Sequence, residues 1–262
     1  MRKKRWAVLA LAAVLALAGC SFGGSGGGGT TVQKIDRPAV ESAEEQFTHP
    51  AAGDTVAVFD TSAGVFKAVL FPDKAPQAYD NFTGLVQQGY YNGLSFHRVI
   101  EGFLVQTGDA TGTGAGGSTI WNGNSYPNEI SDRLHHYAGA VAMAHAPDGA
   151  SGNLSQFYIV QSAQDSVDKT LAKTLTEAGV REAVVTAYQA VGGAPYLDNL
   201  NTVFGQVYDG MDVVDAIAAV ECGEDDRPLE DVIVNSVTIG TYSAAQSGST
   251  PASGASGSDS AA

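Results

Sequence analysis

The sequence predicts a mainly β domain over residues 51–241, with antiparallel strands that form a barrel and two helices that cap it. Three observations support this prediction. Short segments rich in Val, Ile and Phe recur along the chain, and glycine-containing turns separate them. Two amphipathic segments lie far apart among these strands, so strands and helices do not alternate as they would in an α/β sheet. A third helical pattern, near residues 164–194, interrupts the later strands and reads as an insertion.

The first half of the domain reads as a hairpin followed by a helix. The segments TVAVFDT and VFKAVLF flank a turn at residues 62–64. Ala78, Phe82, Leu85 and Val86 then recur at the spacing of one helical face, which ends at Gly89.

The stretch FHRVIEGFLVQTGD, residues 96–109, resembles a buried strand that also carries His97, Arg98 and Gln106. A buried arginine is unfavourable unless it is paired, so Arg98 either lies at the surface or is held in place to act on something. Adjacent residues of a strand point to opposite faces, so we expect His97 to point away from Arg98 and to be structural.

A glycine-dense loop, residues 112–117, follows this stretch. A phosphate-binding loop would need a helix N-terminus directly after it. The next segment, TIWNGNSYPNE, contains glycine and proline and has no helical period. The loop is therefore better explained as a wide turn beside a site.

The second half of the domain adds strands, the insertion and a last helix. HHYAGAVAMAHA and SQFYIVQS read as strands, and residues 164–194 read as two short amphipathic helices broken at Gly179. A strand in NTVFGQVYDG, a helix from Met211 and a final strand in DVIVNSVTIG complete the pattern.

The two ends of the chain have a different character. Residues 1–19 combine a basic start with an apolar run too short to span a bilayer and resemble a bacterial lipoprotein signal, which places lipidation on Cys20. We expect a Gly/Ser-rich, lipid-anchored tether over residues 20–50 and a disordered tail over residues 242–262. These features predict an extracytoplasmic, lipid-anchored protein at the cell membrane.

Charge and histidine spacing exclude several classes of partner. The chain has 14 basic and 28 acidic residues, a balance that repels nucleic acid and anionic lipid headgroups. His135 and His136 are adjacent, so we expect them to point apart on a strand, and no metal site is predicted. Lipidation of Cys20 would leave Cys222 as the single thiol, so no intramolecular disulfide is predicted.

Several motifs together resemble the cyclophilin family of peptidyl-prolyl isomerases. FHRVIEGFLVQTGD is similar to the family signature, and GTGAGG, VAMAHA, SQFYI and YLDNLNTVFGQVYDGMDVVDAI follow in the family's order. The resemblance covers residues 56–239 and implies a closed eight-stranded antiparallel β-barrel capped by two helices. It further implies an enzyme that isomerises X–Pro bonds in unfolded exported proteins and acts as a monomer without a cofactor.

The resemblance also assigns residues to the site. Arg98, Phe103 and Gln106 would be catalytic, with Arg98 at the rim of a groove. The remaining residues implied for substrate binding are Leu104, Met143, Ala144, His145, Gln156, Tyr158, Tyr196, Leu197 and Asn201. Gln156 would support the arginine and its strand.

Some positions depart from the best-known members of the family. Asn201 replaces an aromatic pocket wall, and Tyr196 replaces a tryptophan whose indole N–H the family uses to bind cyclosporin, which predicts weak binding of that drug. The insertion at 164–194 has no counterpart in the compact family pattern and suits either a lid or a docking surface. An alternative function is a chaperone or scaffold that binds proline segments with little turnover.

Overall fold

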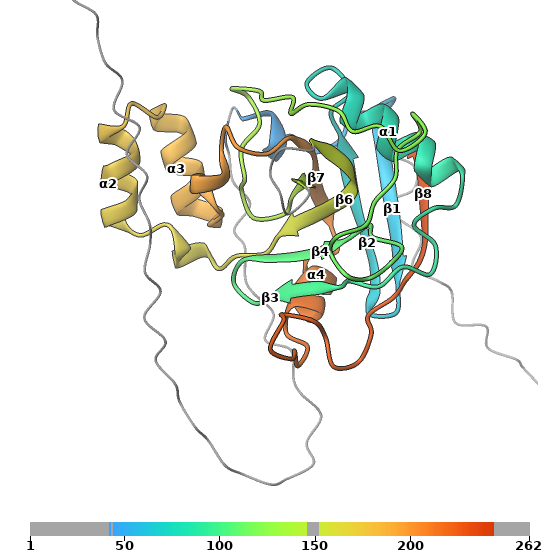
Figure 1. Cartoon of the computed structure of the whole chain (residues 1–262). Coiled ribbons are helices and arrows are strands. Elements are labelled where there is room, and N and C mark those ends of the chain that lie inside the picture. The colour runs from blue at the N-terminus through green and yellow to red at the C-terminus, as the bar shows by residue number, and fades with distance from the viewer. Residues whose placement is uncertain (1–41, 43, 146–151, 244–262) are drawn as a thin grey trace, which may run out of the picture. The chain divides into compact units, whose positions relative to one another are not determined.

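The computed structural model describes residues 42, 44–145 and 152–243 (Figure 1). The expected signal peptide, Cys20, most of the tether and nearly all of the tail lie outside these residues. Among the described residues, no helix has the length and apolar character needed to cross a membrane.

Eight strands form a single antiparallel sheet in the order β3-β4-β6-β5-β7-β2-β1-β8. The strands are β1 (Thr55–Thr61), β2 (Gly64–Leu70), β3 (Arg98–Ile100), β4 (Leu104–Thr107), β5 (Ala140–His145), β6 (Asn153–Val160), β7 (Val203–Asp209) and β8 (Val234–Thr241). The hairpin predicted around residues 62–64 is β1 and β2.

The expected closed barrel is wrong in one respect, because the sheet is strongly curled but open. β3 and β8 are its two edges, and no ladder joins them. An isolated bridge pairs Ser95 with Ile233, just outside both strands. Beyond that bridge the loop after the last helix takes the free edge of β3, since Val99 N–H donates to the carbonyl of Asp226 over 2.7 Å. β3 therefore cannot extend its pairing to β8.

The two capping helices lie where the apolar spacing places them. Figure 1 shows α1 (Pro76–Gln87) above the curled sheet and α4 (Met211–Ala218) below it. Phe82 of α1 and Ile217 of α4 share one buried core with inward residues of the sheet such as Phe59 and Phe157. Burial of these large apolar side chains fixes the curl of the sheet.

The stretch at residues 96–109 is a hairpin and not one strand. β3 ends at Ile100, where the N–H of Phe103 bonds back to its carbonyl over 3.0 Å, and β4 begins at Leu104. Gly102 occupies the turn at a φ of +77°, which glycine adopts without strain. The turn folds the two halves of the stretch onto each other.

The predicted insertion consists of α2 (Lys169–Glu177) and α3 (Glu182–Val191), which lie together to one side of the sheet in Figure 1. Gly179 separates them at a φ of +85°. α3 buries an apolar stripe (Val184, Ala187, Tyr188 and Val191) against Tyr137 of the main domain and Val167. The insertion is therefore packed onto the domain through its second helix.

Some residues before the domain boundary expected at residue 51 already contact the domain. Residues assigned to the tether include the short helix η1 (Glu45–Phe47), and both Glu44 and Gln46 are buried. Gln46 bonds to both backbone groups of His135, at 2.6 and 2.8 Å. These contacts attach residues 44–47 to the domain.

Candidate functional site

Strand register places a row of side chains across the outer face of the curled sheet. Arg98 of β3 pairs with Gln106 of β4, Gln106 pairs with Tyr158 of β6, and Tyr158 pairs with Ala142 of β5. Directly paired residues on one face hold their Cβ atoms about 4.5–5.5 Å apart. A cation, an amide and an aromatic ring therefore stand side by side.

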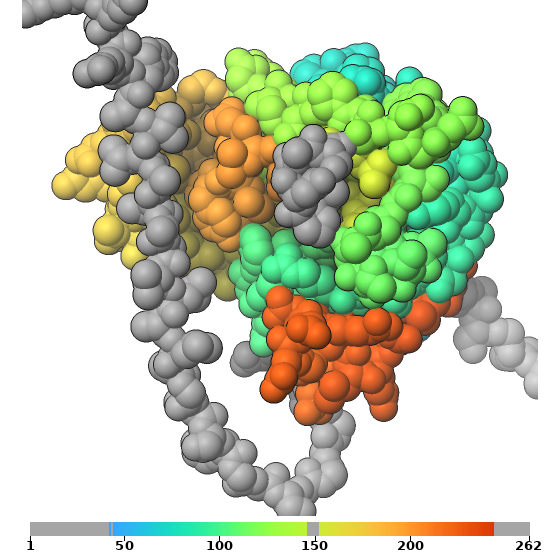
Figure 2. Space-filling model, viewed as in Figure 1, coloured from blue at the N-terminus to red at the C-terminus, as the bar shows by residue number. Residues whose placement is uncertain are grey.

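A groove of about 530 Å³ opens over this row, a volume in the range of small-molecule sites. Nine of the residues expected from the sequence line it: Arg98, Phe103, Leu104, Gln106, Ala144, His145, Tyr158, Leu197 and Asn201. Figure 2 views the face bordered by the β3–β4 hairpin and the loop after it, in greens, and by the segment around residues 195–200, in orange.

The floor of the groove is apolar. Leu104, Tyr158 and Ala144 belong to a buried cluster on the outer face of the sheet, and Phe103 and Leu197 pack against that cluster from either side. Leu197 comes from the short helix η3 (Pro195–Leu197), which stands over the sheet. A floor of this kind suits a small apolar group.

Arg98 stands at the edge of this floor and is half-exposed. Its Nε lies 3.5 Å from the carboxylate of Asp226, which belongs to the loop after α4. The ion pair engages the inner nitrogen of the guanidinium, and the side chain also lines the groove. Among the described residues the terminal N–H groups have no hydrogen-bond partner, and they can donate to a molecule bound in the groove.

Gln106 and Gln156 form a buried amide chain under the groove. Gln106 Nε2 donates to Gln156 Oε1 over 2.9 Å, and Gln156 Nε2 donates to the carbonyls of Gly114 and Gly116. Gln156 therefore supports Gln106 and the glycine-rich loop, and its hydrogen bonds do not reach Arg98. The bond between the two amides fixes the orientation of the Gln106 amide beside the groove.

Asp109 organises the glycine-rich loop. Its carboxylate accepts from the backbone N–H groups of Thr111, Thr113, Gly114 and Gly116 at 2.7–3.1 Å. Burial acts to raise the pKa of Asp109, but these hydrogen bonds outweigh it and lower the pKa below its ordinary value. A Cβ at Gly116 would collide with this carboxylate. The loop's amides are thus already occupied by a carboxylate of the chain itself, which argues against phosphate binding.

The prediction for His97 is wrong in its direction. His97 lies before β3, where the alternation of a strand does not yet hold, and it lines the groove together with Arg98. Its ring sits beside Gly114, and burial lowers its pKa. His97 therefore forms part of the wall under the glycine-rich loop.

Asn201 and His145 each have a side-chain hydrogen-bond partner beside the groove. Asn201 Nδ2 donates to the hydroxyl of Tyr158 over 2.7 Å, and His145 Nε2 lies 2.7 Å from Asn128 Oδ1. Burial raises the pKa of Tyr158, while the bond from Asn201 acts in the opposite direction. Asn201, which replaces an aromatic wall of the family's pocket, thus holds the ring of Tyr158 in place.

Two residues expected at the site do not line the groove, and one stands at its border. Met143 points into the core because alternation along β5 places Ala142 and Ala144 on the outer face. Gln156 lies beneath Gln106. Tyr196 is 61% exposed and tilts against Phe103, with ring centroids 5.9 Å apart, at the border of the groove.

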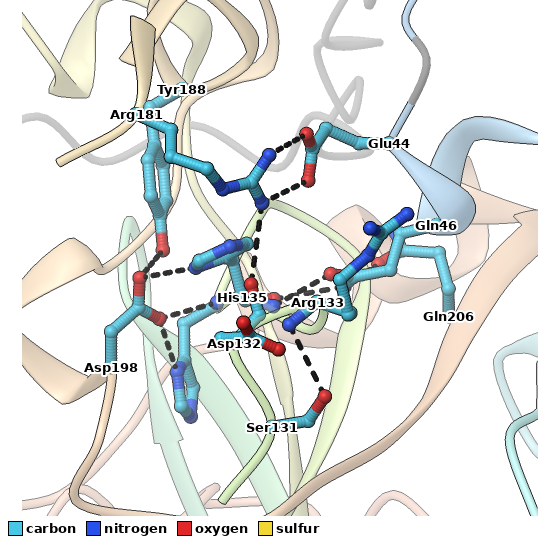
Figure 3. Close-up of polar contacts among 11 residues, drawn as sticks. Glu44, Gln46, Ser131, Asp132, Arg133, His135, Arg181, Tyr188, Asp198 and Gln206 are labelled. Atoms are coloured by element: carbon cyan, nitrogen blue, oxygen red, sulfur yellow. Dashed lines mark hydrogen bonds and ion pairs between the residues drawn. The ribbon is translucent and has the colours of Figure 1, made fainter. Parts of the chain in front are cut away.

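The structure adds a feature that the sequence did not reveal, a cluster around Asp198 behind the groove wall (Figure 3). We expected His135 and His136 to point apart on a strand, but both precede β5 and both direct Nδ1 at Asp198, each over 2.9 Å. Burial acts to raise the pKa of Asp198, but the hydrogen bonds from these two histidines lower it to about 2. No local pattern could have joined these residues, because 62 positions separate His136 from Asp198.

Comparisons with known proteins find relatives in both sequence and fold. The model of the family "Cyclophilin type peptidyl-prolyl cis-trans isomerase/CLD" matches residues 56–239. A Staphylococcus saprophyticus protein provisionally named a peptidyl-prolyl cis-trans isomerase is 41% identical over 70% of this chain and 90% of its own length. A bifunctional phosphatase/peptidyl-prolyl cis-trans isomerase of Streptococcus pyogenes, also provisionally named, is 45% identical over 68% of this chain. The match spans only 37% of that longer protein.

A solved structure is similar as well. The crystal structure of a Cryptosporidium parvum cyclophilin type peptidyl-prolyl cis-trans isomerase, in the presence of the dipeptide Ala-Pro, has a TM-score of 0.57 to this chain. It is 27% identical and covers 71% of this chain and 99% of its own.

Proposed function

This chain belongs to the family of cyclophilin-type peptidyl-prolyl cis-trans isomerases, and on that premise we propose that Arg98 and the apolar groove beside it carry out the isomerisation. The substrates would be X–Pro bonds of unfolded exported proteins. The proline ring would lie on the floor formed by Leu104, Tyr158 and Leu197. Arg98 would donate to the reacting amide.

The reaction requires rotation about an amide bond whose partial double-bond character sets a barrier of ~18–20 kcal/mol. Rotation localises the lone pair on the prolyl nitrogen, which then accepts a hydrogen bond that the planar amide cannot accept. A donor placed there stabilises the twisted state more than either planar isomer. A hydrogen bond from a charged group contributes about 1.5–3 kcal/mol, or one to two powers of ten in rate.

One observation carries this proposal. The register of β3, β4 and β6 brings Arg98, Gln106 and Tyr158 into a single row under one groove. Gln106, held by Gln156, is placed to bond the peptide beside the proline, so that only one side of the bond rotates. The ion pair with Asp226 keeps the guanidinium at the groove's edge.

A proline-binding chaperone with little turnover is the second candidate. Asn201 favours it, because an amide in place of an aromatic wall leaves less apolar surface against a proline ring. The bond from Asn201 to Tyr158 weakens this argument, since it keeps that aromatic ring in the floor. The presence of Arg98 beside the floor favours the enzyme.

The two candidates differ in exchange rate and not in binding. NMR exchange spectroscopy on an Ala-Pro peptide, without a coupled protease, measures cis/trans exchange with the wild type and with Arg98→Ala. Acceleration by the wild type and its loss in the variant would support the role of Arg98. Binding by the wild type without acceleration would leave the chaperone function.

We further propose that the protein is a monomer anchored by lipid on Cys20 at the outer face of the cell membrane. Support comes from the sequence: a basic and apolar leader, small residues before Cys20, and a Gly/Ser-rich segment after it. Detergent phase partitioning of the full chain tests the anchor. The wild type should enter the detergent phase, and Cys20→Ala should remain in the aqueous phase. Equal partitioning would contradict the anchor.

A further inference from the structure

We propose that Asp198 is a positioning residue for the substrate groove, and that the hydroxyl of Tyr188 on α3 sets the place of its carboxylate. The helical insertion would then tune the isomerase from behind the groove wall, without touching substrate. The inference rests on the proposed function, whose failure the experiment below distinguishes.

The carboxylate of Asp198 is a junction of three separate segments (Figure 3). Oδ1 accepts from both the backbone N–H and Nδ1 of His136, each over 2.9 Å. Oδ2 accepts from His135 Nδ1 over 2.9 Å and from the Tyr188 hydroxyl over 2.8 Å. Four donors fill the usual accepting positions of a carboxylate, so its orientation is fully determined.

Two connections lead from this junction to the groove. Asp198 directly follows Leu197, which lines the groove, and its N–H closes η3 by bonding to the Pro195 carbonyl over 3.2 Å. The ring of His136 stacks on that of Tyr158 at 6.1 Å and 21°, and Tyr158 forms part of the floor. A shift of the carboxylate would therefore displace a wall and the floor together.

The other side of the junction is the insertion. Tyr188 is fully buried, and the stripe of α3 that carries it packs against the domain. Arg181, just before α3, makes a two-pronged ion pair with Glu44 at 2.8 and 3.0 Å and donates to the Asp132 carbonyl. α3 is thus fixed at its start and reaches Asp198 through the Tyr188 hydroxyl.

The insertion does not act as a lid in this arrangement. None of the described residues that line the groove comes from α2 or α3. Among the described residues, the side-chain hydrogen bond that joins α3 to the groove wall runs from the Tyr188 hydroxyl to Asp198. A positioning role accounts for a buried tyrosine whose hydroxyl points away from solvent and toward a carboxylate.

The test compares two buried hydroxyls in the same cluster. Tyr188→Phe removes the bond to Asp198. Tyr137→Phe is the matched control, because Tyr137 is equally buried, its ring lies 4.5 Å from that of Tyr188, and its hydroxyl has no hydrogen-bond partner among the described residues. Both variants are made in the full chain. NMR titration with an Ala-Pro peptide gives Kd, and exchange spectroscopy at saturation gives the rate on the enzyme.

We expect Tyr188→Phe to weaken peptide binding three- to tenfold and to leave exchange at saturation within twofold, because Arg98 lies on another segment. Tyr137→Phe should change neither quantity. An unchanged Kd in Tyr188→Phe, an equal change in both variants, or a loss confined to the rate at saturation would overturn the inference.

A second variant keeps the result independent of the tyrosine. Asp198→Asn retains the size of the side chain, removes its charge, and should weaken binding at least as much as Tyr188→Phe. Circular dichroism establishes that each variant is folded. A folded Asp198→Asn with wild-type Kd would also overturn the inference. A wild type that binds peptide without accelerating exchange would instead refute the proposed function and leave the comparison of Kd values valid.

Discussion

The two walls of the groove are built in different ways. Arg98, Phe103 and Gln106 come from one short hairpin, and backbone ladders place them. Leu197 and Asn201 come from a segment outside the sheet. The part-buried carboxylate of Asp198, two histidines and a tyrosine from the insertion hold that segment in place. The hairpin wall thus depends on hydrogen bonds that any sequence can make, whereas the opposite wall depends on particular side chains. We therefore expect chemistry to be sensitive on the first wall, and stability and binding on the second.

The largest effect should come from the hairpin wall. Arg98→Lys keeps the charge but loses the planar fork, and it should reduce catalysed exchange ten- to a hundredfold while peptide Kd changes less than threefold. Exchange spectroscopy and titration measure the two quantities. Arg133→Lys, at an exposed arginine, is the control and should match the wild type. A Kd that rises in step with the lost rate would make Arg98 a binding residue.

For the opposite wall we expect an effect on the free energy of unfolding at acidic pH. The pKa of Asp198 is lowered to about 2 from an ordinary 3.8. A depressed pKa stabilises the fold above the unfolded pKa, and that stabilisation is lost as pH falls from about 4 to about 2. Asp198→Asn should therefore lower the free energy of unfolding by about 2 kcal/mol near neutral pH and flatten its decline in that range.

Urea unfolding between pH 2 and pH 7 measures this effect. Asp80→Asn, at an exposed position on α1, is the matched control and should leave the pH dependence unchanged. Parallel curves for the wild type and Asp198→Asn would mean that the junction does not stabilise the fold.

A smaller effect concerns Tyr196 at the border of the second wall. The phenol in place of the family's indole predicts weak binding of cyclosporin. Tyr196→Trp should restore one hydrogen bond and improve the drug's Kd by up to about tenfold. Isothermal calorimetry measures the change, and Tyr208→Trp, whose ring packs on His49, is the control. Nanomolar binding by the wild type would contradict the premise.

The smallest effect should come from the outer support of Arg98. Asp226→Asn removes a half-exposed ion pair and should slow exchange about threefold at low salt, with the difference vanishing near 0.5 M salt. Glu224→Gln removes the same charge from the same loop, at an exposed position that lies outside the groove lining. Equal effects of the two variants would show that Asp226 acts only through the general field of the loop.

Local patterns predicted much of this molecule. Apolar spacing placed the helices containing Phe82 and Ile217, and Gly179 marked the break between α2 and α3. Each of these signals arises within a single helix or turn, so it can be read from neighbouring residues. The groove residues of the β3–β4 hairpin could be predicted because they all lie in one motif, residues 96–109. Strand alternation failed at His97 and at His135 and His136, since these residues lie just before the strands begin.

What the sequence could not reveal depends on pairings between distant segments. The open edge of the sheet follows from a loop that takes the place of a neighbouring strand at Val99. The junction at Asp198 joins histidines 62 and 63 residues away with a tyrosine ten residues away. The placement of Met143 required the parity of β5, which the motif alone does not fix.

The contacts of residues 44–47 show that the structural domain extends beyond the segment matched by the family. The part shared with the family begins at residue 56. A protein shortened to start at residue 56 would lack Glu44 and Gln46. Arg181 would lose its carboxylate partner, and the backbone of His135 would lose its hydrogen bonds to Gln46. The shortened protein would keep every groove residue yet lose part of the frame behind Leu197. For this chain, the segment that matches the family is therefore shorter than the segment whose contacts support the groove.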